Sequence, residues 1–219
     1  MTQNNNKIDE SLLPKHRVEA LTDGIFAIVM TIIILELKTP ENIPMNKMHS
    51  ELPNVFFNLI PAIEAYILSF FVLGTFWLRH QIQFKYIVNV DRTIIILNIF
   101  FLMMTGLIPF TVGVLMKYPN SELTFLIYIL NLILISSILT IQLSYVFSKQ
   151  NIATDNISEE SKNKFKLLSY IPIIIFAISL FVSFVNVRLA LFIIYLDPLF
   201  YLFYHHFSKK NRNKSLLTS

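Results

Sequence analysis

The stretch that decides the fold runs from Thr93 to Met116 and reads TIIILNIFFLMMTGLIPFTVGVLM, without a single charged side chain. A helix of about 20 apolar residues is long enough to cross the hydrocarbon core of a bilayer. The whole chain of 219 residues has the same character, because 54% of it is hydrophobic and only 15% is charged. Soluble domains carry about 25% charged residues. The sequence therefore predicts an all-α, polytopic membrane protein.

Five further apolar runs give six candidate transmembrane helices. They are Gly24–Leu35, Pro53–Leu78 (interrupted by Glu64), Leu123–Ser148, Leu167–Val187 and Leu189–Phe207 (broken by Asp197). The first run is unusual, because its uncharged part between Asp23 and Glu36 would make a helix only about 18 Å long. It is either a re-entrant segment or a full helix that other helices shield from lipid. We favour the shielded helix, since six crossings agree with the distribution of positive charge.

Lysine and arginine predict the orientation of the spans. Of the 18 Lys and Arg residues, 14 lie in the N-terminal segment, the second and fourth loops and the C-terminal tail, and 4 lie in the alternate loops. Positive residues accumulate on the cytoplasmic side of membrane proteins. We therefore predict a multi-pass protein of the cell membrane with both termini in the cytoplasm. Its predicted parts are a polar N-terminus at 1–16, a six-helix transmembrane domain at 17–207 and a basic tail at 208–219, with residues 151–166 as the sizeable cytoplasmic loop.

Several kinds of function are excluded by what the sequence lacks. The chain has no Cys, which removes disulfides, Cys-ligated metals and thiol nucleophiles. It has no Gly-rich phosphate loop, no HExxH and no Gly-x-Ser-x-Gly. Residues 111–113, Thr-Val-Gly, begin like the TVGYG potassium filter, but Val114 and Leu115 replace its second half. His205 and His206 are expected at a solvated helix end. We therefore predict no enzymatic activity, no cofactor, no resident metal and no nucleic-acid partner.

The first run has a distinctive face. On a helical wheel, four of its side chains fall within about 60° of one another. They are Gly24, Ile28, Thr31 and Leu35. This small or apolar face with one hydroxyl either lines a narrow pathway or fills an ordinary core, and periodicity alone leaves both interpretations open.

Polar side chains in the next two runs are candidate partners for Asp23, which lies on the opposite side of the helix from this face. His80 lies near the same boundary as Asp23, and we expect the two to bond between helices. Asn98 is either a separate inter-helix bond or a further member of that pair. Trp77 is typical of a membrane interface.

Residues 17–24, Arg-Val-Glu-Ala-Leu-Thr-Asp-Gly, resemble the RxxxFSD motif that opens the lysosomal and endosomal potassium channel family, transmembrane protein 175. Leu21 and Thr22 replace the family's Phe and Ser and keep their chemical type. Further similarities lie at Ala27, Ile28, Thr31, Trp77, His80, Asn98, Pro109 and Phe110. The resemblance covers roughly residues 15–112, and beyond them only the number of spans.

This resemblance implies a cation channel with modest potassium selectivity. Single-unit microbial members of the family are six-span prokaryotic proteins that assemble in the bilayer as homotetramers around the first helix. By that analogy Ile28 forms a hydrophobic constriction, Thr31 and Leu35 line the path outward from it, and potassium ions bind only in transit. The network that holds the first helix would consist of Arg17, Asp23, Trp77, His80 and Asn98.

Two other functions stay open from the sequence. A proton-coupled secondary transporter, or a proton-leak pathway, would use an intramembrane carboxylate such as Asp23, Glu64 or Asp197. Against it, the sequence has no paired broken helices and no inverted repeat. A structural membrane protein without ion flux is the third possibility. The oligomeric state discriminates between them, because a pore around the first helix needs several copies of the chain.

Overall fold

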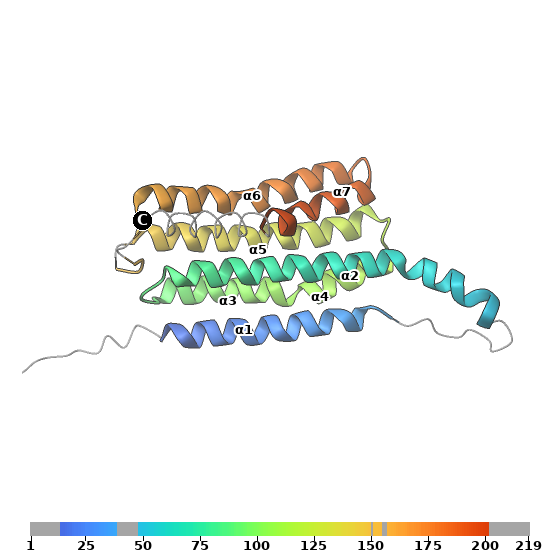
Figure 1. The fold of residues 1–219 in the computed structure, drawn as a ribbon, viewed down its shortest axis with the longest axis horizontal. Coiled ribbons are helices and arrows are strands. Elements are labelled where there is room, and N and C mark those ends of the chain that lie inside the picture. Colours follow the sequence, from blue (N-terminus) through green and yellow to red (C-terminus); the bar gives the residue numbers. More distant parts are fainter. Residues whose placement is uncertain (1–13, 39–47, 150, 155–156, 202–219) are drawn as a thin grey trace, which may run out of the picture.

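The computed structural model describes residues 14–38, 48–149, 151–154 and 157–201. Across these residues the chain is helical, and its helices run side by side along one long axis (Figure 1). The elements are α1 (Lys15–Ile32), η1 (Ile33–Glu36), α2 (Met48–Lys85), α3 (Arg92–Gly106), α4 (Ile108–Lys117), α5 (Glu122–Ser148), α6 (Glu159–Ser183) and α7 (Val187–Ile194). In this described part, the one strand-like contact is an isolated bridge between Ile87 and Ala153. The predicted all-α fold class is confirmed.

Five segments of the described residues are long and apolar enough to cross a membrane. They are Lys15–Glu36, Leu52–Lys85, Arg92–Lys117, Glu122–Ser148 and Glu159–Ser183. The predicted sixth span begins as α7, is interrupted at Tyr195, and is helical again from 196 to 201. Its remainder, with His205 and His206, lies outside the described residues, as do the predicted terminal segments 1–13 and 208–219.

The first span is a full helix rather than a re-entrant segment. It begins after Pro14, passes the charged residues at its start and continues beyond Ile32 as a 3₁₀ turn to Glu36. The segment Lys15–Glu36 has 22 residues, which is enough to cross a bilayer. However, α1 lies at the edge of the bundle, and its main helix neighbours among the described residues are α2, α3 and α4 (Figure 1). The shielding from lipid that we expected is therefore not supplied by the other helices of the same chain.

The third predicted span consists of two collinear helices. Helix α3 ends at Gly106, and α4 begins at Ile108 with Pro109 in its first turn. A proline has no N–H to donate to the carbonyl four residues earlier, and its ring crowds that carbonyl, so the helix breaks just before it. The backbone N–H of Leu107 turns back to Met104 O at 3.2 Å. The predicted span Thr93–Met116 therefore lies within one apolar segment, Arg92–Lys117, which has a one-residue turn at Leu107.

Helix α5 occupies the centre of the bundle. It lies between the α6–α7 pair and the helices α2 to α4 (Figure 1). The side chains of Phe125, Tyr128 and Leu132 are fully buried, and the Tyr128 hydroxyl lies 3.0 Å from the hydroxyl of Ser69 on α2. This core joins both halves of the chain around one helix.

Two connections pair at the end of the bundle where α1 begins. Val88 N–H donates to Ile152 O at 2.8 Å, and Thr154 N–H donates to Tyr86 O at 3.0 Å. Ile87 and Ile152 are buried there in a second hydrophobic cluster that also contains Val18 of α1. This end therefore fixes the start of α1 against the loops that follow α2 and α5.

Candidate pore helix and its anchoring network

Helix α1 has one buried face and one bare face. The buried face follows the expected helical spacing and consists of Val18, Thr22, Phe26 and Val29, continued by Ile33 in the 3₁₀ turn. The predicted face of Gly24, Ile28, Thr31 and Leu35 is exposed along its whole length. Ile28 is 54% exposed and Leu35 is 73% exposed. These side chains therefore fill no core of this chain, which leaves them to lipid or to another copy.

Asp23 ties α1 to α2 through two donors. The indole Nε1–H of Trp77 donates to Asp23 Oδ1 at 2.8 Å, and the side-chain amide of Gln81 donates to the same oxygen at 2.6 Å. Trp77 and Gln81 stand four residues apart, so both side chains point from one side of α2. Gln81 was missed in the sequence analysis, although its spacing from Trp77 is the signal that identifies it.

Thr22 ties α1 to α3 through a second, buried set of bonds. The amide Nδ2 of Asn98 donates to Thr22 Oγ1 at 3.1 Å, and the Thr22 hydroxyl donates to Val18 O at 3.0 Å. His80 Nε2 lies 2.9 Å from Asn98 Oδ1. Because that oxygen only accepts, His80 must carry its hydrogen on Nε2.

His80 therefore bonds with Asn98 and does not form the expected bond with Asp23. The ring is fully buried between Phe84 and Phe101, at centroid distances of 4.1 Å and 5.4 Å. This stacking directs Nε2 toward α3, while Asp23 accepts hydrogen bonds from the longer side chains of Trp77 and Gln81. Asp23 and His80 thus belong to two separate sets of hydrogen bonds. The two sets meet α1 at consecutive residues, Asp23 in one and Thr22 in the other.

Arg17 stands outside these bonds. Its side chain is exposed and makes no hydrogen bond or ion pair with any described residue. Glu19 is paired instead with Lys15, one turn earlier on the same helix, at 3.7 Å. Of the five residues named for the network, the structure brings together Asp23 with Trp77 and His80 with Asn98, and places Arg17 outside the bonds made among the described residues.

Thr31 presents an oxygen on the bare face of α1. Its Oγ1 lies 2.9 Å from Ala27 O and 2.8 Å from Ile28 O, so its single hydrogen is used within the helix. The remaining lone pairs of an exposed hydroxyl oxygen are available to a cation or to water. This is the one polar side chain of the predicted face.

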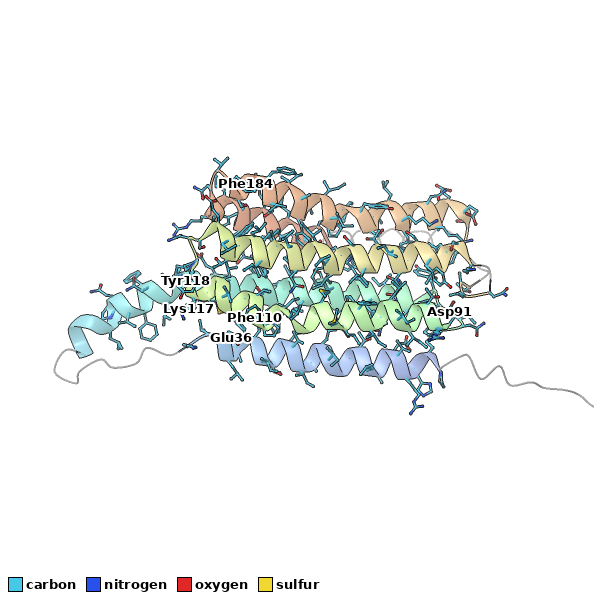
Figure 2. The ribbon with its side chains drawn as sticks, turned by 180° about the vertical axis from the view of Figure 1, so that it is seen from behind. Glu36, Asp91, Phe110, Lys117, Tyr118 and Phe184 are labelled. Atoms are coloured by element: carbon cyan, nitrogen blue, oxygen red, sulfur yellow. The ribbon has the colours of Figure 1, made fainter. Side chains whose placement is uncertain are left out.

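A groove of about 900 Å³ lies beside the C-terminal half of α1. Apolar side chains of α1 and of the α3–α4 segment form its walls, among them Ile28, Ile32 and Phe110. Glu36 and Lys117 lie at its outer end, where Figure 2 shows them near Phe110 and Tyr118. The bare face of α1 is thus continuous with a hollow apolar surface.

The other intramembrane acids lie away from α1. Asp197 is buried, with 1% of its surface exposed, and Thr75 Oγ1 donates to its Oδ2 at 3.0 Å. It lines a cavity of about 350 Å³ together with Arg79. Glu64 is exposed, and its backbone oxygen accepts from the Tyr195 hydroxyl at 3.2 Å. Among the described residues, no three His, Asp or Glu side chains are close enough together to hold a metal ion.

The residues that form the anchoring network fall within one family-defining segment. Residues 17–109 match the sequence model of TMEM175, the endosomal/lysosomal potassium channel. Through this segment, the chain is similar to the TMEM175 family. The family is one of ion channels, not of enzymes.

Named proteins similar to this chain come from bacteria and from animals. A potassium channel of Streptomyces collinus is 33% identical over 110 residues, which are 48% of this chain and 50% of the relative, so the alignment spans about half of that protein. A potassium channel of a Chryseobacterium species is 29% identical over 190 residues, which are 87% of this chain and 93% of the relative. The endosomal/lysosomal proton channel TMEM175 of Rattus norvegicus is 23% identical over 139 residues, which are 64% of this chain and 27% of that protein.

Solved structures share the fold of this chain. The crystal structure of a lysosomal potassium-selective channel TMEM175 homologue from Chamaesiphon minutus superposes with a TM-score of 0.75. The superposition covers 86% of this chain and 96% of the other, at 19% sequence identity. The likeness extends beyond the segment matched by the family model and therefore includes the helices that follow α4.

Proposed function

We propose that this chain forms a homotetrameric cation channel that prefers potassium and whose pore is lined by α1. The observation that carries the proposal is the bare face of α1, on which Ile28 is 54% exposed and Leu35 is 73% exposed. Relatives named as potassium channels support the choice of ion.

Several copies of the chain would resolve the conflict between the charges of α1 and its position at the edge. Asp23 is exposed in the single chain, although a charge facing hydrocarbon costs several kcal/mol. A ring of four copies closed around α1 would turn this helix away from lipid and toward its symmetry mates. The predicted shielding would then come from neighbouring chains.

In such a ring the bare face supplies a gate and a weak filter. Branched apolar side chains at Ile28 exclude water, so an ion cannot pass without shedding hydration that nothing replaces. The Thr31 oxygen lies one turn further outward and offers lone pairs to a passing cation. Leu35 lines the next turn. Selectivity from one ring of hydroxyls is expected to be modest, because no ring of backbone carbonyls replaces the hydration shell.

The bonds of Asp23 and Thr22 would hold each pore helix at a fixed rotation. They attach α1 to α2 and α3 from one side only, and so leave the opposite side free. Gating then requires Ile28 to rotate or the copies of α1 to move apart.

The test is potassium and sodium flux from liposomes that contain the purified protein, with Ile28→Ala as the variant. We expect potassium flux to exceed sodium flux, and Ile28→Ala to raise the flux of both ions because a shorter side chain admits water. The matched control is Ile174→Ala on α6, since Ile174 is also an isoleucine and is 55% exposed. Absence of ion flux from well-folded tetramers, or equal effects of the two variants, would contradict the pore assignment.

Proton transport is a second candidate function, and the buried carboxylate of Asp197 favours it. Relatives in vertebrates are named as proton channels. A proton-coupled carrier or proton leak through this acid would lose its proton flux in Asp197→Asn and would not require a tetramer. Unchanged proton flux in that variant would exclude Asp197 as the carrier of protons.

The orientation that we propose places both termini in the cytoplasm of a cell-membrane protein with the domain boundaries given above. The chain has no Cys, so an introduced cysteine would be the only thiol of the protein that can be labelled. Lys149→Cys should be protected from an impermeant maleimide added to intact cells, and Asn120→Cys should react. The reverse pattern would invert the topology.

A further inference from the structure

We propose that Arg17 lines the mouth of the pore at the start of α1, where four guanidinium groups form a ring of positive charge that slows the entry of potassium. The inference deepens the proposed function and rests on it, since it treats the bare face of α1 as the wall of a tetrameric pore. It gives Arg17 a role in ion entry in place of the role in the anchoring network that the sequence resemblance implied.

The geometry of α1 places Arg17 on the bare face. The helix is continuous from Lys15 to Ile32, and successive residues of an α-helix are about 100° apart. Gly24 and Ile28, seven and eleven residues later, therefore each lie within about 20° of Arg17 around the helix axis. Thr22, which is buried and bonded to α3, lies about 140° away from Arg17. Arg17 thus continues the face of Ile28 toward the start of the helix.

The charge of Arg17 is not compensated within the part of the chain that the structure describes. Lys15 pairs with Glu19 at 3.7 Å, and Asp23 accepts hydrogen bonds from two side chains of α2. The Arg17 side chain is exposed and has no hydrogen bond or ion pair with a described residue. One positive charge per copy therefore remains on the face that would surround the pore axis.

A ring of such charges acts on ions before they reach the constriction. Four guanidinium groups around one axis raise the electrostatic potential at the entrance, which lowers the local concentration of potassium and raises that of anions. Arg17 lies about 16 Å along the helix from Ile28, so the ions that it repels are still hydrated.

Salt distinguishes this effect from a structural one. The Debye length is about 30 Å at 0.01 M ionic strength and about 3 Å at 1 M, so mobile ions screen the ring in concentrated salt. The slowing of potassium entry should therefore be strong in dilute salt and weak in concentrated salt. A change in packing has no such dependence.

The first measurement is potassium flux per reconstituted tetramer at about 0.01 M and about 1 M salt. We expect Arg17→Gln to raise the flux about threefold over the wild type in dilute salt, and to match it in concentrated salt. Arg17→Lys keeps the charge and should match the wild type in both. The matched control is Arg92→Gln, since Arg92 is also exposed and begins α3 at the same end of the bundle (Figure 1). It should match the wild type as well.

The second measurement tests the position of Arg17 without ion flux. The chain has no Cys, so Arg17→Cys introduces one thiol per copy. A short bis-maleimide should join Arg17→Cys copies within one tetramer, because the bare faces meet at the axis. Arg92→Cys copies should stay unjoined under the same conditions.

The outcomes separate the ring from the pore itself. Unchanged flux of Arg17→Gln in dilute salt would overturn the proposal, and so would intact tetramers in which Arg17→Cys copies are not joined. An effect of Arg17→Gln that persists in concentrated salt and appears also in Arg17→Lys would make Arg17 a structural residue, which also overturns it. If the wild type carries no potassium at either salt concentration, the proposed function fails and the role in ion entry fails with it, whereas the cross-linking still decides whether Arg17 faces the axis.

Discussion

Helices α1 and α5 are both hydrophobic enough to span a membrane, yet they are used in opposite ways. Helix α5 buries 14 of its 27 residues within its own chain, whereas α1 buries 4 of its 18. The buried faces of both helices mix apolar and polar side chains, but only α1 has an exposed acid, Asp23, that bonds to a neighbouring helix. Hydrophobicity alone thus does not identify the core of a membrane protein, since an apolar face can be reserved for other copies.

The largest expected effect comes from the same truncation in the two helices. Leu132→Ala on α5 leaves a cavity in a fully buried site and should cost about 2–4 kcal/mol of stability. Leu35→Ala in the 3₁₀ turn after α1 removes an exposed side chain and should cost less than about 0.5 kcal/mol while raising ion flux. Thermal unfolding and liposome flux of both variants measure the contrast. Equal losses of stability would mean that Leu35 is packed in the assembly and does not line a pore.

Two buried asparagines sharpen the comparison at a smaller scale. Both side-chain atoms of Asn98 on α3 are bonded, to Thr22 of α1 and to His80, whereas neither side-chain atom of Asn131 on α5 has a partner. Asn98→Leu leaves the buried side chains of Thr22 and His80 without this partner and should lower the stability of the protein by about 1–3 kcal/mol. Asn131→Leu removes an unsatisfied amide and should be neutral or stabilising.

Thermal unfolding of the two asparagine variants side by side is the measurement. The two substitutions are chemically identical, so a difference between them reports only the bonds. If Asn131→Leu is as destabilising as Asn98→Leu, then Asn131 is bonded in the native protein to water or to a neighbouring chain, and α5 is not as self-contained as its packing indicates.

The sequence predicted the spans, and it predicted which side chains of α1 share one face, because both depend on patterns within one helix. A run without charge from Thr93 to Met116 indicates a span, and the spacing of Ile28, Thr31 and Leu35 indicates one face whatever the neighbours are. The break at Leu107 could also have been predicted from the sequence, since Pro109 lacks a backbone N–H donor.

The hydrogen bonds between polar groups of different helices could not be predicted from the sequence. Bonds between helices depend on the rotation of each helix about its axis, and that rotation is set by packing far from the polar groups. The rings of Phe84 and Phe101 orient His80 toward Asn98, so the expected bond to Asp23 does not form.

The smallest expected effect concerns the only hydroxyl of the bare face. Thr31→Val keeps the shape of the side chain and removes the oxygen, whose hydrogen is used within α1 and whose lone pairs face outward. Because the lost bonds lie within one helix and the site is exposed, the apparent Tm should hardly change. The ratio of potassium to sodium flux should fall about two- to fivefold, since a ring of hydroxyl oxygens is a weak substitute for hydration.

Thr31→Ser is the control for this substitution, because it keeps the oxygen and loses only a methyl group, and its ion preference should stay near that of the wild type. Thr105→Val on α3 provides the opposite control, since Thr105 also donates back to its own helix, at 2.8 Å to Phe101 O, but is fully buried. If ion preference falls equally in Thr31→Val and Thr105→Val, the effect is one of helix packing. If it falls in neither, the preference arises at Ile28, where size and dehydration and not oxygen ligands would distinguish the two ions.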